Sequence, residues 1–215
     1  MNTELETQNA QPALQLGVVI LAAGGSTRMG RPKLLLPWGV TTVLGHLVAQ
    51  WRELGAGQIA VVCATGDTAM LDELDQPANR RVSRIFNPQP ELGMFSSIRC
   101  AAQWTGWEPD LRQFTLALGD QPHLRATTLR ALVEFAAEHP DEVCQPARSG
   151  RPRHPVLLPS ALFRELRGTT EENLRDFLKA HASEPALCTV DDRGLDLDMD
   201  SPADYAEAKR LAGLD

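Results

Sequence analysis

The sequence predicts an α/β fold of three layers, in which helices cover both faces of a mostly parallel sheet. Short apolar runs alternate four times with amphipathic segments along residues 16–138. The connections between them are short, as they are where helices link parallel strands. The first run, Leu16–Ala22, contains no polar residue, which is typical of a strand buried on both faces.

Each of the first four strands is followed by a segment with helical spacing. Apolar residues recur every three or four positions along residues 42–54, and two glycines follow, which indicates a helix and its end. Asp67 stands where a side chain caps the next helix. We expect strands at Leu16–Ala22, Gln58–Cys63, Arg81–Phe86 and Phe114–Leu118, and helices at Thr42–Leu54, Asp67–Leu74, Met94–Trp104 and Ala126–Glu138.

The pattern is less regular after Pro140. Two short strands are expected around a basic turn, then a helix, a strand and a closing helix that has a proline in its first turn. These elements are expected at Val143–Ala147, Pro155–Pro159, Glu171–His181, Ala186–Val190 and Pro202–Leu211. We expect a single domain over residues 16–215, with a lobe for a second ligand at 140–200. Residues 1–15 lack the basic and apolar blocks of a signal peptide, which predicts a disordered tail.

The composition argues against several classes of protein. The formal net charge of the 215 residues is −7, whereas sequence-independent nucleic-acid binding needs broad positive charge. No apolar run approaches the roughly 18 residues of a membrane span. The four cysteines lie 37 to 44 residues apart, which is not zinc-site spacing, and we expect reduced thiols in a cytoplasmic protein.

A glycine-rich loop, residues 22–33, follows the first strand at the end of the sheet where such folds bind ligands. It reads AAGGSTRMGRPK. The glycines let backbone N–H groups face an anion, and Arg28 and Lys33 add charge for phosphate oxygens. A Walker A loop has Lys and then Ser or Thr after its last glycine, but Arg31 and Pro32 stand there; the dinucleotide-binding spacing is absent as well. The loop therefore predicts another kind of polyphosphate site, with a merely flexible basic turn as the alternative.

The segment LAAGGSTRMGRPKLLLP, residues 21–37, resembles the signature loop of the MobA-like nucleotidyltransferases, which attach nucleotides to the molybdenum cofactor. It is more distantly similar to the cytidylyltransferases of isoprenoid synthesis and the sugar-nucleotide pyrophosphorylases. The resemblance extends along Leu16–Arg210, and Ala23 and Pro32 match the cytidylyl-transferring members. It implies a Rossmann-like nucleotidyltransferase fold. It also implies transfer of CMP from CTP to the phosphate of molybdopterin or molybdenum cofactor, with release of pyrophosphate.

The resemblance also assigns residues to the nucleotide. It implies catalytic roles for Arg28, Lys33 and Asp120. Asn87-Pro88 followed by Gly93-Met94-Phe95-Ser96-Ser97-Ile98 matches a second family motif, and in related enzymes a serine there contacts the nucleotide, although ordinary helix capping explains Ser96 or Ser97 equally well. The nucleotide-binding residues are expected to be Leu21, Ala22, Ala23, Gly24, Gly25, Lys33, Ser97 and Asp120.

Two acidic residues are expected to hold Mg²⁺, which prefers carboxylate and phosphate oxygens. Asp120 follows the strand FTLALG directly, and the next helix is expected too far away for Asp120 to cap it. Asp196, Asp198 and Asp200 alternate, so an extended segment would place them on one face, where solvent or a cation must relieve their repulsion. A solvated acidic turn is the alternative. Because residues 198–202 resemble the family's D-I-D-T-P segment, Asp200 is the expected second ligand.

The turn Gly150–Val156 resembles the family's G-x-x-G-H-P-V turn, with Arg153 in place of glycine. Arg153 and His154 are therefore expected to contact the acceptor in an acceptor-binding lobe at 140–200, although a lone histidine is often structural. Expected partners are CTP, molybdopterin or molybdenum cofactor, and a molybdenum hydroxylase or its maturation chaperone, with neither nucleic acid nor membrane. Two alternatives stay open: transfer to a sugar phosphate or methylerythritol phosphate, and a non-catalytic NTP-binding cofactor chaperone.

Overall fold

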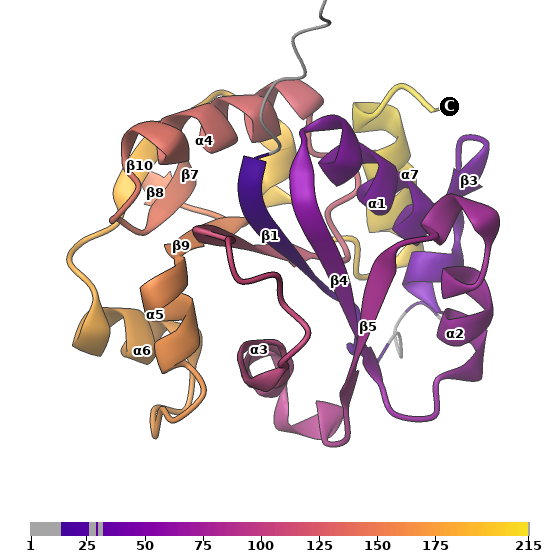
Figure 1. The fold of residues 1–215 in the computed structure, drawn as a ribbon. Helices are drawn as coiled ribbons and strands as arrows, with labels where there is room; N and C mark the ends of the chain where they lie inside the picture. The colour runs from indigo at the N-terminus through magenta and orange to yellow at the C-terminus, as the bar shows by residue number, and fades with distance from the viewer. Residues whose placement is uncertain (1–13, 26–28, 30–31, 215) are drawn as a thin grey trace, which may run out of the picture.

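The computed structural model describes residues 14–25, 29 and 32–214 (Figure 1). The expected tail lies almost wholly outside the described residues, and so does Arg28. None of the helices in the described ranges is long and apolar enough to cross a membrane.

All four cysteines are described and none forms a disulfide. Burial raises the pKa of Cys144 to about 11, so this thiol stays protonated at neutral pH.

Eight of the described strands form one mostly parallel sheet, as the sequence predicts. Its order is β10-β7-β9-β6-β1-β4-β5, and β8 pairs with β7. The strands β6, β1, β4 and β5 are mutually parallel, β9 is antiparallel to both β6 and β7, and β10 is parallel to β7. Their bounds are β1 Leu14–Leu21, β4 Ala56–Ala64, β5 Val82–Asn87, β6 Gln113–Leu118, β7 Cys144–Arg148, β8 Arg151–Pro152, β9 Val156–Pro159 and β10 Ala186–Thr189.

Helices pack on both faces of this sheet, which confirms the three layers (Figure 1). Alternate residues of β1 enter two separate cores: Val18 and Ile20 pack with α1, α4 and α7, whereas Val19 packs with α3, α5 and α6. This is why the first apolar run lacks polar residues. The helices are α1 Val43–Glu53, α2 Thr68–Leu74, α3 Met94–Gln103, α4 Ala126–Glu138, α5 Ser160–Glu165, α6 Leu174–His181 and α7 Pro202–Leu211.

Most predicted elements are confirmed to within about two residues. The helix expected from Glu171 begins at Leu174 instead, because the Asn173 side chain accepts a hydrogen bond from Asp176 N (3.0 Å) and caps it there. The sequence pattern missed α5 and the small hairpin of β2 (Pro37–Trp38) and β3 (Thr41–Thr42), since such short segments carry little periodicity.

The buried carboxylate of Asp192 attaches the C-terminal segment to α4. It accepts hydrogen bonds from Arg125 N (3.1 Å) and from the Thr128 hydroxyl (2.7 Å) at the start of that helix. It also accepts one from Gly194 N (2.9 Å) at the start of η5, the 3₁₀ turn Arg193–Asp196. A charge buried in this way is tolerated because several donors replace its water. The residues that follow η5 are thereby held beside the end of β6.

The free energy of unfolding is expected to fall as the pH is lowered from about 7 to about 5. Burial lowers the pKa of His46, His123 and His154 below the ordinary 6.5, so in this interval the unfolded chain takes up protons that the folded chain refuses. This stabilisation is complete above the unfolded value of 6.5 and is lost as the pH falls through the lowered values. Urea unfolding across the interval measures it. His123→Gln should flatten the dependence, and constant stability would contradict the expectation.

Candidate functional site

The glycine-rich loop and Asp120 meet because β1 and β6 end side by side. Leu21 pairs with Leu118, and Gly119 N donates a hydrogen bond to Leu21 O (3.2 Å). A Cβ at Gly119 would lie 2.7 Å from that same carbonyl oxygen, so the close approach requires glycine. The parallel register thus places the loop next to the first side chain beyond β6, which is Asp120.

Lys33 joins Asp120 to Asp200. Its ammonium donates to Asp120 Oδ2 at 2.7 Å and to Asp200 Oδ1 at 3.2 Å. The lysine side chain is 12% exposed, and the two carboxylates are 21% and 37% exposed. Burial by itself would lower the pKa of Lys33, but Asp120 and, to a smaller extent, Asp200 outweigh it and raise the pKa. The lysine is therefore charged at neutral pH, and the two distant acids lie close enough to share one cation.

The Asp200 segment is fixed beside Asp120 through the main chain. Met199 N donates a hydrogen bond to Asp120 O (3.1 Å), and the Met199 side chain is fully buried in the core. The flanking residues Asp198 and Asp200 therefore point outward. A hydrogen bond of the backbone and a buried methionine thus decide where the second carboxylate lies.

The three alternating acids of this segment have three different partners. Asp200 pairs with Lys33, and Asp198 Oδ1 accepts from Gln121 Nε2 at 3.0 Å. Asp196 ends the 3₁₀ turn η5 and pairs with Arg153 and Arg148, which hold the pKa of this carboxyl below its usual range. The mutual repulsion of the three carboxylates is therefore relieved by a separate hydrogen-bond donor for each of them rather than by a single shared cation.

One oxygen of Asp120 suits a cation. Asp120 Oδ1 is buried and has no hydrogen-bond partner within the described part of the chain, which is costly for a carboxylate unless something binds it. No cluster of three or more His, Cys, Asp or Glu residues of the kind that holds a metal occurs among the described residues. A divalent ion at Asp120 and Asp200 would therefore take its other ligands from water or phosphate, as Mg²⁺ commonly does.

A cavity of about 300 Å³ lies between the glycine-rich loop, Asp120 and the start of α3. All eight residues expected to bind the nucleotide line it, together with Leu34, Pro90, Gly93, Met94, Leu118 and Gly119. Ser97 is oriented by Asn87, whose Nδ2 donates to the Ser97 and Ser96 hydroxyls at 2.9 and 2.7 Å. Since Ser97 Oγ accepts that bond, its own hydrogen can be donated into the cavity.

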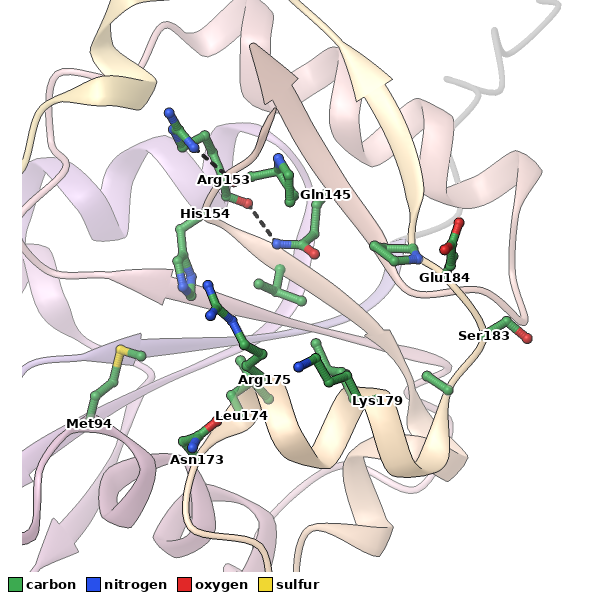
Figure 2. A pocket seen from close by; sticks show the side chains of 15 residues that line it. Met94, Gln145, Arg153, His154, Asn173, Leu174, Arg175, Lys179, Ser183 and Glu184 are labelled. Carbon is green, nitrogen blue, oxygen red and sulfur yellow. Dashed lines mark hydrogen bonds between the residues drawn. The ribbon is translucent and has the colours of Figure 1, made fainter. Parts of the chain in front are cut away.

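A second and larger pocket, about 680 Å³, opens beside the first (Figure 2). It lies between α6 and strands β7–β9, and Met94 at the start of α3 lines both cavities. Arg153 and His154, the expected acceptor contacts, line it as well. They arrive there because β9 is antiparallel to β6: Val156 pairs with Leu116, so the residues that precede β9 lie near the end of β6.

The two expected acceptor contacts, Arg153 and His154, differ in charge and in their hydrogen-bond partners. The Arg153 guanidinium is occupied by Asp196, with Nη2 at 2.7 Å and Nε at 3.0 Å from Oδ1. Burial lowers the pKa of His154, so the imidazole is neutral at pH 7. Its Nδ1 is buried without a partner among the described residues. Asp198 and Asp120 lie near enough to act on the His154 pKa, which places this ring between the pocket and the Lys33 cluster.

Sequence reasoning missed the part of the second pocket that α6 supplies. Arg175 and Lys179 line it one helical turn apart, with Asn173 and the apolar Leu174 and Leu178. The spacing of two basic residues at i and i+4 was visible in the sequence. Their position facing the Arg153 turn was not, because it depends on how α6 packs against the sheet.

The chain resembles known proteins over most of its length. The profile of the MobA-like NTP transferase domain matches residues 18–185. Molybdenum cofactor cytidylyltransferase of Escherichia coli (strain K12) is 25% identical over 192 residues, which cover 89% of this chain and 94% of that protein.

Solved structures are similar as well. Rv0371c from Mycobacterium tuberculosis H37Rv has a TM-score of 0.70 and 28% identity, covering 92% of this chain and 98% of that one. Its complex with manganese has a TM-score of 0.66 and 26% identity, with coverage of 90% and 97%. A 4-diphosphocytidyl-2C-methyl-D-erythritol synthase has a TM-score of 0.67 at 18% identity, covering 91% and 97%, which is a likeness of fold alone.

Replacing Gly119 by alanine is expected to destabilise the protein by about 1–3 kcal/mol, the usual cost of overpacking. The new methyl group would displace the Leu21 carbonyl and the Leu34 side chain, 2.9 Å away. Gly168→Ala is the matched control, because a Cβ there meets no atom within 4 Å. Urea unfolding measures both variants. Equal stability of the two would show that the tight approach of β1 and β6 is not required.

Proposed function

The chain belongs to the family of MobA-like NTP transferase domains, and we propose that this nucleotidyltransferase moves CMP from CTP to the terminal phosphate of molybdopterin or molybdenum cofactor. One observation carries the proposal: the Lys33 ammonium lies between Asp120 and Asp200 at the edge of the cavity that the glycine-rich loop lines. A site that only senses a nucleotide needs no such convergence of charges from three segments, which argues against the non-catalytic alternative.

The proposed chemistry needs no general base. An oxygen of the acceptor phosphate, anionic at neutral pH, attacks the α-phosphorus of CTP in line. A new P–O bond forms, and the bond from the α-phosphorus to the bridging oxygen breaks. Pyrophosphate leaves with that electron pair. Catalysis of this kind depends on positioning and on neutralising phosphate charge. Lys33 is suited to that role because its pKa is raised, and Arg28 is proposed to assist it.

Asp120 and Asp200 are the residues proposed to hold a divalent cation, and we propose Mg²⁺. Asp120 Oδ1, which has no hydrogen-bond partner among the residues that the structure describes, and the half-buried Asp200 are hard oxygen donors of the type this ion prefers. A cation bound there would neutralise negative charge on the phosphates. The structurally similar Rv0371c was solved as a complex with manganese, which supports the proposal of a divalent ion here.

The nucleotide is proposed to lie in the smaller cavity. Backbone groups of the loop from Leu21 to Gly25 would face the phosphates, and Ser97 would donate a hydrogen bond to the nucleotide. CTP as the donor is supported by Ala23 and Pro32, and by similarity to the cytidylyltransferase of E. coli.

The acceptor is proposed to lie in the larger pocket, lined by Arg153 and His154 within residues 140–200. The similarity to a molybdenum cofactor enzyme favours molybdopterin, and with it a molybdenum hydroxylase or its maturation chaperone as recipient. Methylerythritol phosphate is the second candidate acceptor, because an enzyme that makes its cytidylyl derivative shares the fold.

A panel of nucleotides tests the proposal directly. The protein is incubated with Mg²⁺, molybdopterin and either CTP, GTP, ATP or UTP, and pyrophosphate release is measured. We expect release with CTP and much less with the others. A preference for GTP would refute the donor assignment, and release only when methylerythritol phosphate or a sugar phosphate replaces molybdopterin would refute the acceptor assignment.

Lys33→Ala is expected to lower turnover by about 10²-fold or more, if the ammonium supplies roughly 3 kcal/mol at the transition state. Lys209→Ala is the control, since Lys209 lies on α7 with its ammonium over the Tyr205 ring. Turnover of that variant should stay near that of the wild type. Circular dichroism and urea unfolding exclude a folding defect, and near-normal turnover of Lys33→Ala would contradict the mechanism.

A further inference from the structure

The larger pocket has two ends of different chemical character (Figure 2). Glu184 and Ser183 lie at one end. At the other end, the side chain of Arg175 extends from α6 toward the His154 ring, and Lys179 extends from the same side of the helix. His154 and Met94, which connect this pocket to the neighbouring cavities, also lie at this end.

Arg175 and Lys179 are the cations of this pocket that keep their charge available. Within the described ranges, neither side chain has an ion pair or a hydrogen bond, and Glu184 is the sole acidic residue that lines the pocket. The nearest acid on their own helix, Asp176, is tied to the Asn173 cap, whose Nδ2 donates to Oδ2 at 2.8 Å. Two like charges at i and i+4 weaken a helix slightly, by a few tenths of a kcal/mol. A bound anion would remove that repulsion.

Arg153 is less suited to bind an added anion. Asp196 accepts two hydrogen bonds from its guanidinium, and Arg148 contacts the same carboxylate. An anionic ligand would have to compete with Asp196 for this charge, whereas it would meet no such competitor at Arg175 and Lys179.

Between its ends, the pocket has an apolar wall. Leu174 and Leu178 on α6 line it together with Val156 and Pro152 of the β8–β9 region and with Met94 of α3. Amide groups of Gln145 and Asn173 lie among them. Its volume of about 680 Å³ is more than twice the 300 Å³ of the nucleotide cavity. A ring system that packs on leucines and offers polar atoms to the two amides fits such a lining better than a small polyhydroxylated sugar does.

We propose that Arg175 and Lys179, rather than the Arg153 turn, bind the phosphate monoester of an acceptor whose flat ring system lies along Leu174, Leu178 and Val156. The inference rests on the proposed function, in which the acceptor phosphate attacks the nucleotide. Arg175 holds that phosphate on the side of His154, toward the Asp120 cluster. Lys179 contributes charge from one turn further along α6. Both are exposed, so their loss should not affect folding.

Steady-state kinetics of the full chain give the first test. In the double variant Arg175→Ala/Lys179→Ala, the KM for molybdopterin should rise by about 10-fold or more, while the KM for CTP stays unchanged. The control, Arg130→Ala/Arg164→Ala, removes the same charge from exposed positions on α4 and α5 outside the pocket. Its KM values should match the wild type. An unchanged KM for molybdopterin in the α6 variant would overturn the inference and leave the proposed function intact.

A binding measurement that needs no turnover gives the second test. The chain has three lysines, Lys33, Lys179 and Lys209, so reductive ¹³C-methylation yields three side-chain signals, which Lys179→Ala and Lys209→Ala assign. Phenyl phosphate, a monoester on a flat ring, should shift the Lys179 signal and leave that of Lys209 in place. The shift should weaken in Arg175→Ala. If molybdopterin is not a substrate, the proposed function fails, but a shift of Lys179 still supports the anion site. If the Lys179 signal shifts with neither phenyl phosphate nor molybdopterin, the proposed anion site at Arg175 and Lys179 is refuted.

Discussion

The site depends on one electrostatic contact, the Lys33 ammonium between the carboxylates of Asp120 and Asp200. It connects three segments far apart in the chain: the loop after β1, the end of β6 and the segment before α7. Such a partly buried pair contributes little net stability, because desolvating the charges offsets their attraction. Its consequence is geometric, since it holds two carboxylates and a cation at the mouth of one cavity. Under the proposed function, a metal-bound triphosphate would meet these charges already close together.

Backbone and core contacts position those charges independently of their pairing. Parallel register aligns the ends of β1 and β6, and Gly119 allows the two main chains to approach closely. The Asp192 cap and the buried Met199 then direct the C-terminal segment back to Asp120. None of these contacts involves the side chains of Lys33, Asp120 or Asp200, so the pairing of these three charges need not supply the energy that positions them.

The change of strand direction between β6 and β9 creates the second pocket. A strand parallel to β6 would begin beside the start of β6, at the end of the sheet opposite Asp120. The antiparallel β9 instead begins beside the end of β6, so the turn that carries Arg153 and His154 lies near Asp120. Helix α6 then packs opposite this turn and places the positive side chains of Arg175 and Lys179 in the pocket, although the net charge of the chain is −7. Local placement, rather than overall charge, makes this region suitable for an anion.

The sequence by itself determined the class of fold and the residues that line the cavity at the end of β1 and β6. Continuous apolar runs, helical spacing and caps are local signals, and they gave the strands and helices to within about two residues. The signature loop and the Gly-Asp after β6 lie at strand ends, so topology alone predicted that they meet. Local signals failed where elements are short, as with α5, or where a cap such as Asn173 competes with periodicity.

The tertiary structure alone decided how the remaining charges are distributed. The sequence shows three alternating acids and several arginines, but it cannot show that Asp196 engages Arg153 while Asp200 meets Lys33. Nor can it show that α6 directs Arg175 and Lys179 into a pocket formed with β7–β9. The physical reason is that ion pairing depends on distance in space, which side-chain packing sets between segments more than 40 residues apart in the chain.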